Sequence, residues 1–302
     1  MIGKVLGVEK PLVLAPMGFV SGGALAAAVS HAGGLGLIGA GYGDAEWIRR
    51  EFTQAKGTRV GIGFITWSLA KQPALLDFAL ERKPCAVMLS FGDPAPFAAK
   101  IKASGARLIC QVQDLATTRQ ALAAEPDVLV AQGTEAGGHG GTRSLFALLP
   151  AVLDIAGTIP VLAAGGIADR RGVQAAMAFG AAGVLVGTRF SASDEALTAP
   201  RAKQRIVETT GDATVRTTVF DVVRTYDAGW AGITGRALRN KFTEAWHGRE
   251  GDLIAKREAE VKKYWQAVER QDFDTALVFA GEGVDLIDAV LPAAEIVRRM
   301  VA

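Results

Sequence analysis

Short runs of apolar residues recur along the first two thirds of the chain. They show little polar alternation, which is typical of strands buried on both faces of a parallel sheet. Between the runs lie stretches of helical composition, such as residues 22–33, 114–125 and 169–181. The eight runs occupy residues 12–17, 35–40, 59–65, 86–91, 107–112, 128–133, 159–166 and 183–190.

This alternation predicts the fold class. Eight strand–helix units, at intervals of roughly twenty to thirty residues, are what a (β/α)₈ TIM barrel requires. A doubly wound open sheet has similar units, so a strand count alone does not prove closure. We predict the closed barrel, and we expect the active site at the carboxyl ends of its strands.

The alternation of apolar runs with helical stretches ends after residue 190. Residues 192–210 and 252–271 are charged and helical in pattern, residues 214–224 resemble a short β element, and residues 229–240 resemble a loop with a turn. The last residues end in an amphipathic helical pattern that can return to the barrel.

These patterns divide the chain into two domains. We predict that residues 1–195 and 280–302 form the barrel. Residues 196–279 are expected to form a smaller, mostly helical second domain, inserted after strand 8 as a cap over the substrate site.

Composition narrows the class of protein. The 33 basic and 31 acidic residues are interspersed, which argues against a nucleic-acid partner. Residues 11–43 carry no formal charge, but they are rich in glycine and are interpreted as a buried strand–helix–strand rather than a membrane segment. Cys85 and Cys110 lie in or beside apolar runs and suit a reducing compartment. We therefore expect a cytoplasmic enzyme without a membrane partner.

Residues 34–39, GLGLIG, formally match a dinucleotide-binding fingerprint. That motif needs a strand before it and a helix opening within it. Here a helical stretch precedes the glycines, which lie inside the apolar run itself. We interpret them as glycines that end a helix and lead into a closely packed strand.

Glycines after the seventh and eighth runs indicate a phosphate site. The loops after these two barrel strands commonly bind a phosphate group. Gly165, Gly166, Gly187 and Thr188 offer unobstructed backbone N–H donors there, and Thr188 adds a hydroxyl. Simple βα turns are the alternative reading of each motif alone, but the two together favour an anionic ligand.

His139 is the candidate catalytic residue. It lies after the sixth run with two glycines on each side, and Glu135 stands four residues before it. An imidazole titrates near neutral pH, so it can take a proton from a substrate carbon and return it. His31 and His247 lack such a setting. No histidine or cysteine lies at ligand spacing from His139, so no metal site is expected.

With these motifs, the chain resembles the nitronate monooxygenase family, formerly called 2-nitropropane dioxygenases. The resemblance rests on LAPM at 14–17, AQGTEAGGHGG at 131–141, PVLAAGGIAD at 160–169 and GAAGVLVGTRF at 180–190, and more weakly on AGEGVDLID at 280–288. It implies an FMN-dependent (β/α)₈ barrel that oxidises alkyl nitronates, and nitroalkanes as a further substrate class, with O₂ to carbonyl compounds and nitrite.

The resemblance also implies roles for residues of this chain. His139 matches the proposed catalytic base. Gly137 and Gly138 would line the flavin, and Ala15, Pro16 and Met17 would pack near its ring. Gln111 and Gln132 would contact the edge of the ring, while Gly165, Gly166, Gly187 and Thr188 would hold the phosphate. The chain departs from many members at GIGFITW (61–67), near Gln111 and at Gly140, and these departures concern the substrate more than FMN.

Other functions stay open at this point. FMN-dependent NAD(P)H reductases are one alternative: the enoyl-ACP reductases have a similar EAGGH loop, and quinone reductases belong to the same group. A barrel that binds flavin or phosphate without catalysis, and an FMN-free lyase or isomerase for a phosphorylated metabolite, are further alternatives. The partners expected are a small substrate and O₂, and the sequence leaves open whether the chain forms a homodimer.

Overall fold

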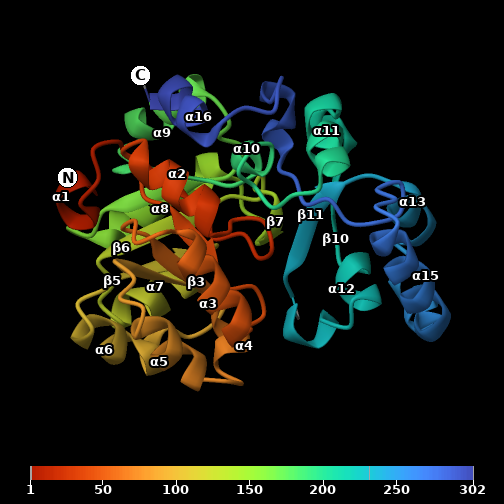
Figure 1. Cartoon of the computed structure of the whole chain (residues 1–302), viewed down its shortest axis with the longest axis horizontal. Helices are drawn as coiled ribbons and strands as arrows, with labels where there is room; N and C mark the ends of the chain where they lie inside the picture. The colour runs from red at the N-terminus through yellow and green to blue at the C-terminus, as the bar shows by residue number, and fades with distance from the viewer. Residues whose placement is uncertain (1, 231, 302) are drawn as a thin grey trace.

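The computed structural model describes residues 2–230 and 232–301. Its largest part is a barrel of parallel strands (Figure 1). The strand order is β1-β9-β8-β6-β5-β4-β3-β2, with every pair parallel. The strands are β1 (Leu12–Leu14), β2 (Leu37–Gly39), β3 (Gly61–Ile65), β4 (Ala86–Ser90), β5 (Arg107–Val112), β6 (Val128–Gln132), β8 (Val161–Ala164) and β9 (Gly183–Val186). Each lies within one of the eight apolar runs.

Backbone contacts between β1 and Leu35, two residues before β2 begins, close the sheet. Val13 forms a parallel bridge with Leu35. The Leu14 amide donates to the Leu35 carbonyl over 2.8 Å, and the Leu35 amide donates to Leu12 over 3.0 Å. The predicted TIM barrel is therefore confirmed, and the open-sheet alternative is excluded.

Helices surround the barrel, and apolar side chains fill both sides of the strands. The interior cluster includes Val13, Met88, Ile109 and Leu162, all fully buried. The helices of this part are α1 (Ile2–Leu6), α2 (Gly23–His31), α3 (Ala45–Gln54), α4 (Thr66–Leu69), α5 (Ala74–Leu80), α6 (Ala95–Ala103), α7 (Leu115–Ala123), α8 (Leu145–Ala156), α9 (Arg170–Ala178) and α10 (Thr188–Ser191). This burial on both faces explains the apolar runs.

The glycines of residues 34–39 serve packing, as expected. Helix α2 ends at His31, before the first of them. A Cβ added to Gly36 would lie 1.9 Å from the Ala26 carbonyl oxygen, so only glycine allows α2 to approach the backbone here. The segment does not open a helix, and the dinucleotide-binding reading is wrong.

The chain after the barrel builds a second core. Buried Phe220, Phe242, Leu253 and Tyr264 pack together there. The elements are α11 (Pro200–Glu208), β10 (Thr214–Thr217), α12 (Val219–Val223), β11 (Thr234–Leu238), α13 (Lys241–Trp246), α14 (Glu250–Ala255) and α15 (Arg257–Glu269), with short 3₁₀ turns η1 (Gly211–Ala213) and η2 (Asp227–Trp230). We call residues 196–279 the cap; its domain boundaries stay a prediction.

One expectation for the cap was wrong, and a second was met only in part. Residues 229–240 were expected to form a loop, but β11 occupies most of their second half. Residues 214–224 contain a strand, as expected, followed by the short helix α12. Strand β11 pairs with β10 on one side and with β7 (Gly138–Gly140) on the other, in an antiparallel sheet. Its neighbours in space, rather than its own sequence, make it a strand.

The C-terminal segment returns to the barrel, as predicted. The 3₁₀ turn η3 (Glu282–Leu286) is followed by α16 (Ala293–Val301), which packs against α2 and α9. The buried Arg189 guanidinium donates to the carbonyls of Ala192 and Ala289, over 3.1 and 2.6 Å, and ties this segment to the end of the eighth barrel strand. In residues 2–230 and 232–301, no helix has the length and apolar character needed to cross a membrane.

Candidate active site

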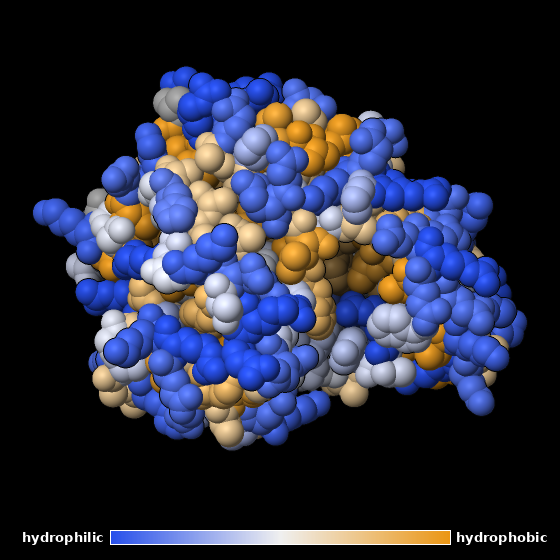
Figure 2. All heavy atoms as spheres, in the orientation of Figure 1, coloured by the Kyte–Doolittle hydropathy of each residue, from blue (hydrophilic) through white to orange (hydrophobic). Residues whose placement is uncertain are grey.

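The predicted site residues lie at the carboxyl ends of the barrel strands. Ala15–Met17 follow β1, Gln111 lies near the end of β5, and Gln132 ends β6. Gly165 and Gly166 follow β8, and Gly187 and Thr188 follow β9. In the space-filling view the surface is hollowed between the barrel and the cap, with hydrophobic residues along parts of the recess (Figure 2). The barrel topology thus brings these residues to one face.

The loop with His139 becomes the short strand β7. His139 pairs with Gly235 of β11, so a segment from the barrel forms the edge of the cap sheet. On its other side, the Gln132 amide nitrogen donates to the His139 carbonyl over 2.9 Å. The Gln132 oxygen accepts from Gln111 and Gln113, over 3.1 and 3.2 Å. Backbone pairing and this glutamine group therefore fix His139 from two directions.

A cap carboxylate contacts the His139 ring. The His139 Nε2 atom lies 2.9 and 3.0 Å from the two carboxylate oxygens of Asp221 in α12. The His139 side chain is 8% exposed and that of Asp221 is 2% exposed. A buried carboxylate with a charge-switchable partner is unusual in a core and is typical of functional sites.

Aromatic rings enclose the imidazole. Trp230 stacks on His139 with ring centroids 3.5 Å apart and planes 3° from parallel, and Phe279 meets it edge-on at 5.4 Å. The Trp230 indole nitrogen donates to the Tyr42 hydroxyl over 3.0 Å. Burial raises the pKa of Tyr42 to about 12, so this hydroxyl stays neutral. These rings limit water around the imidazole.

A cavity of about 250 Å³ adjoins this aromatic group. Trp67, Phe91 and Trp230 form part of its wall, together with Gln111 and Gln113 at the end of β5. The walls are mainly apolar with a few polar groups, as is usual for small-molecule sites.

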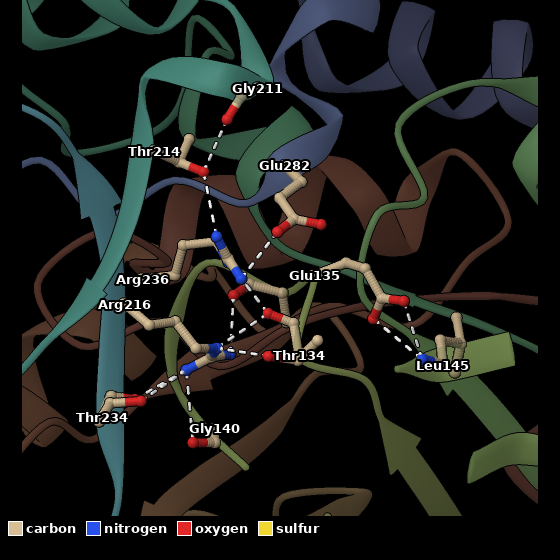
Figure 3. Close-up of polar contacts among 11 residues, drawn as sticks. Thr134, Glu135, Gly140, Leu145, Gly211, Thr214, Arg216, Thr234, Arg236 and Glu282 are labelled. Atoms are coloured by element: carbon tan, nitrogen blue, oxygen red, sulfur yellow. Dashed lines mark hydrogen bonds and ion pairs between the residues drawn. The ribbon is translucent and has the colours of Figure 1, made fainter. Parts of the chain in front are cut away.

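Two arginines of the cap hold the loop before His139 (Figure 3). Arg216 of β10 donates from Nε to the Thr134 carbonyl over 2.9 Å, and from its terminal nitrogens to the carbonyls of Thr234, Ala136 and Gly140 over 2.8 to 3.3 Å. Arg236 of β11 also donates to the Thr134 carbonyl, over 3.0 Å. The planar fork of guanidinium donors can bind several carbonyls at once.

Nearby acids balance these two cations. Arg236 forms an ion pair of 2.8 Å with Glu282 of the returning segment. Burial, then the positive charge of Arg236, lowers the pKa of Arg216 to about 10, against the opposing effect of Glu282 and Glu135. Arg216 is therefore still charged at neutral pH. The Glu135 carboxylate also accepts from the Leu145 amide at the start of α8, over 2.9 Å, so it is structural.

Backbone amides without a described acceptor follow the neighbouring strands β8 and β9, where the phosphate was expected. Gly165 and Gly166 have φ of 114° and 69°, the left-handed region that glycine adopts readily. The amides of Gly165, Gly166 and Gly187 donate no hydrogen bond to any residue that the structure describes. Thr188 opens α10, and its hydroxyl accepts from the Gly281 amide over 3.0 Å. Free N–H groups of this kind suit an anion.

The end of β1 packs beside this cradle of amides. A Cβ on Gly187 would lie 3.4 Å from the Met17 sulfur and 3.5 Å from the Ala15 Cβ. Pro16 covers Gly63 of β3 so closely that a Cβ there would lie 2.2 Å from the proline ring. The three residues therefore form a wall at the barrel mouth, but no contact among them shows a ligand.

The remaining histidines and the cysteines do not join the site. His31 contacts Thr58 on the surface over 3.2 Å, and His247 lies 3.8 Å from Glu250. Burial raises the pKa of the Cys110 thiol to about 12, which disfavours a reactive thiolate.

Sequence reasoning did not find Asp221, Trp230, Arg216 or Gln113. Asp221 carried a usable signal, because it is a lone acid in the apolar segment VFDVV, which has the pattern of a buried element. Nothing local distinguishes Arg216 from a solvated charge, since its partners are carbonyls that lie far away in the sequence.

Comparisons with known proteins agree with this geometry. The family model for nitronate monooxygenase matches residues 1–60 and 65–302. The chain belongs to the nitronate monooxygenase family. It is therefore an enzyme of the oxidoreductase class.

Individual relatives extend the likeness over nearly the whole chain. The chain is 36% identical to nitronate monooxygenase npaC of Metarhizium robertsii, over 96% of this chain and 90% of that protein. The structure of FabK from Thermotoga maritima is 30% identical, with a TM-score of 0.87, over 99% and 94% of the two chains. The nitroalkane oxidase of Streptomyces ansochromogenes is 26% identical, with a TM-score of 0.82, over 99% and 96%.

Proposed function

We propose that this protein oxidises alkyl nitronates, and nitroalkanes after their deprotonation, with O₂ and bound FMN, to carbonyl compounds and nitrite. The observation that carries the proposal is the placement of His139 at the barrel mouth, on the same face as a cradle of free backbone amides. The nitronate monooxygenase and nitroalkane oxidase relatives support the substrate class.

The residues at the mouth fit FMN. The free amides of Gly165, Gly166 and Gly187 suit its phosphate, with Thr188 beside them. Ala15, Pro16 and Met17 provide an apolar wall for the ring, and Gly137 and Gly138 keep the loop before His139 free of side chains. When bound, FMN supplies the redox chemistry with nitronate and O₂, while the protein supplies binding and orientation.

The two glutamines differ in what they can offer the ring edge. The Gln132 amide is engaged on both atoms, with the His139 carbonyl and with Gln111 and Gln113. The Gln111 oxygen accepts no hydrogen bond from the described residues. We therefore assign the polar contact with the flavin edge mainly to Gln111, and we assign to Gln132 the support of His139.

His139 acts as the base for neutral nitroalkanes. The C–H bond at the carbon next to the nitro group breaks, its electron pair remains on the substrate as a nitronate, and the proton moves to the imidazole. A preformed nitronate needs no such step. Around the base, Trp230 and Phe279 exclude water, and the cavity of about 250 Å³ beside Trp230 has room for a small alkyl group.

The direct test measures cofactor and product. The purified protein is assayed for bound FMN, and then for O₂ consumption and nitrite release with propyl-2-nitronate, with no pyridine nucleotide present. We expect FMN close to one per chain and nitrite release that depends on O₂. Protein that neither retains nor takes up FMN contradicts the proposal, and so does FMN-loaded protein that releases no nitrite.

A further inference from the structure

Asp221 is the structural partner of the proposed base, and it comes from the cap rather than from the barrel. We propose that Asp221 is a positioning residue that fixes the proton on Nε2 of His139 and so makes Nδ1 the atom that accepts the substrate proton. This inference rests on the proposed function for the substrate, but the claim about the imidazole itself can be tested without it.

The contact geometry determines which nitrogen is free. Both oxygens of Asp221 face Nε2, at 2.9 and 3.0 Å. An ionised carboxylate only accepts hydrogen bonds, so Nε2 must donate. A neutral imidazole has one N–H, and its lone pair then lies on Nδ1. In residues 2–230 and 232–301, no side-chain hydrogen bond involves Nδ1 of His139.

The same pair also stabilises the product of proton transfer. When Nδ1 takes the substrate proton, the ring becomes a cation with its Nε2–H on the carboxylate, and the opposite charge lies within hydrogen-bond distance. The stacked face of Trp230 adds a favourable contact for a cationic ring and excludes water from that side. Asp221 therefore favours both the correct tautomer and the charged state that follows.

The cap holds Asp221 rigidly. Val219, Phe220, Val222 and Val223 of the same helix are all buried in the cap core, and Asp221 itself is 2% exposed. His139, in contrast, comes from a barrel loop. The base is thus complete only when the cap is docked on the barrel.

Two substitutions remove the carboxylate in different ways. Asp221→Asn removes the charge and brings an amide NH2 group that can donate to Nε2, and Asp221→Leu removes charge and hydrogen bonding at similar size. Asp274→Asn is the matched control, because Asp274 is a cap acid that pairs with Arg205 over 2.6 Å and does not contact His139.

The first measurement is ¹⁵N NMR of protein with labelled histidine, at a pH where the imidazole is neutral. The chain has three histidines, and His139→Asn identifies the signals of His139. We expect Nε2 protonated and Nδ1 unprotonated in the wild type and in Asp274→Asn. Asp221→Asn and Asp221→Leu should both show more of the tautomer protonated on Nδ1, because an amide can donate to Nε2 and a leucine contacts neither nitrogen by a hydrogen bond. A wild-type His139 with its proton on Nδ1 would overturn the inference.

The second measurement compares turnover of a neutral nitroalkane with that of its preformed nitronate. In Asp221→Leu we expect nitroalkane turnover to fall by roughly 10²-fold or more, the size of a general-base contribution, with nitronate turnover changed less than about threefold. Asp221→Asn should also lose nitroalkane turnover by roughly 10²-fold or more, because an amide that donates to Nε2 leaves the proton on Nδ1. Nitroalkane turnover in either variant that equals the control overturns the inference, and so does an equal loss on both substrates.

The two proposals fail in different ways. A wild type that oxidises no nitronate defeats the proposed function, while the NMR result still decides the tautomer. If Asp221→Leu does not fold, Asp221→Asn provides the kinetic comparison and the wild-type spectrum provides the tautomer.

Discussion

At the scale of single residues, the site combines one titratable ring with groups that have no side-chain chemistry at all. His139 lies against Asp221 and Trp230, while the proposed phosphate site consists of backbone amides of Gly165, Gly166 and Gly187. Glycine is needed at Gly165 and Gly166, where φ is positive, and there a bare backbone can approach an anion directly. The two halves of the site can therefore be tested separately.

Replacement of His139 by asparagine tests the base. We expect His139→Asn to lower kcat/KM for neutral nitroalkanes by roughly 10²- to 10⁴-fold, because proton abstraction is lost. Preformed nitronates should lose less than about tenfold, since they need no base. Steady-state O₂ consumption on both substrates measures the difference. His31→Asn is the control and should match the wild type. Equal losses on the two substrates contradict the assignment.

A charge placed in the amide cradle tests the FMN phosphate site. Gly187→Asp should weaken FMN binding by roughly ten- to a hundredfold or more, because the new carboxylate repels the phosphate. Fluorescence titration of the apoprotein with FMN measures this. Gly187→Ala is the control, because its Cβ makes ordinary contacts at 3.4 Å or more. If the FMN affinity of Gly187→Asp is unchanged, the phosphate does not bind at Gly187.

At the scale of secondary-structure elements, sheet β10-β11-β7 joins the cap to the His139 loop. The glycine-rich segment with His139 was predicted to be functional from its composition, and its strand conformation depends on pairing with β11. Strand β11 itself was missed because its pairing partners are distant in the sequence. The barrel strands were found correctly, since burial on both faces leaves a continuous apolar run. Patterns that arise from one element could thus be predicted, and contacts between distant elements could not.

Arg216 tests the importance of this sheet. Arg216→Met should lower the free energy of unfolding by at least about 2 kcal/mol, because it removes the guanidinium donors from the part-buried carbonyls of Ala136, Gly140 and Thr234. Arg216→Lys should fall between the wild type and Arg216→Met, since an ammonium group cannot bind the same set of carbonyls. Urea unfolding followed by circular dichroism measures the order. If Arg216→Met is as stable as the wild type, the guanidinium does not hold the loop.

At the scale of the whole molecule, barrel and cap have separate cores but share strands and residues. The cap supplies Asp221 and Trp230, the barrel supplies His139, and the returning segment supplies Glu282 to Arg236. The family resemblance indicated FMN and the base from the sequence alone. The contact between His139 of the barrel and Asp221 of the cap could not be predicted from the sequence, because the two residues are more than eighty positions apart.

We expect barrel and cap to unfold together. Strand β7 belongs to the barrel loop and to the cap sheet, so separation of the two would break β-sheet pairing as well as the His139–Asp221 contact. Urea transitions followed by tryptophan fluorescence and by circular dichroism should coincide. Saturation with FMN at about 100 times its Kd should raise the free energy of unfolding by about 2.7 kcal/mol. Two resolved transitions would show that the cap is an independent unit.

The central claim is that nitronate, rather than a pyridine nucleotide, reduces the bound flavin. Overall fold does not decide this, since both FabK and the nitroalkane oxidase share it. The most direct measurement is an anaerobic stopped-flow titration that follows the flavin absorbance bands, with propyl-2-nitronate and NADPH added in separate runs. Our account predicts loss of the oxidised flavin bands with nitronate alone and no comparable change with NADPH. Rapid bleaching by NADPH, together with no response to nitronate, would contradict it and favour an FMN-dependent reductase.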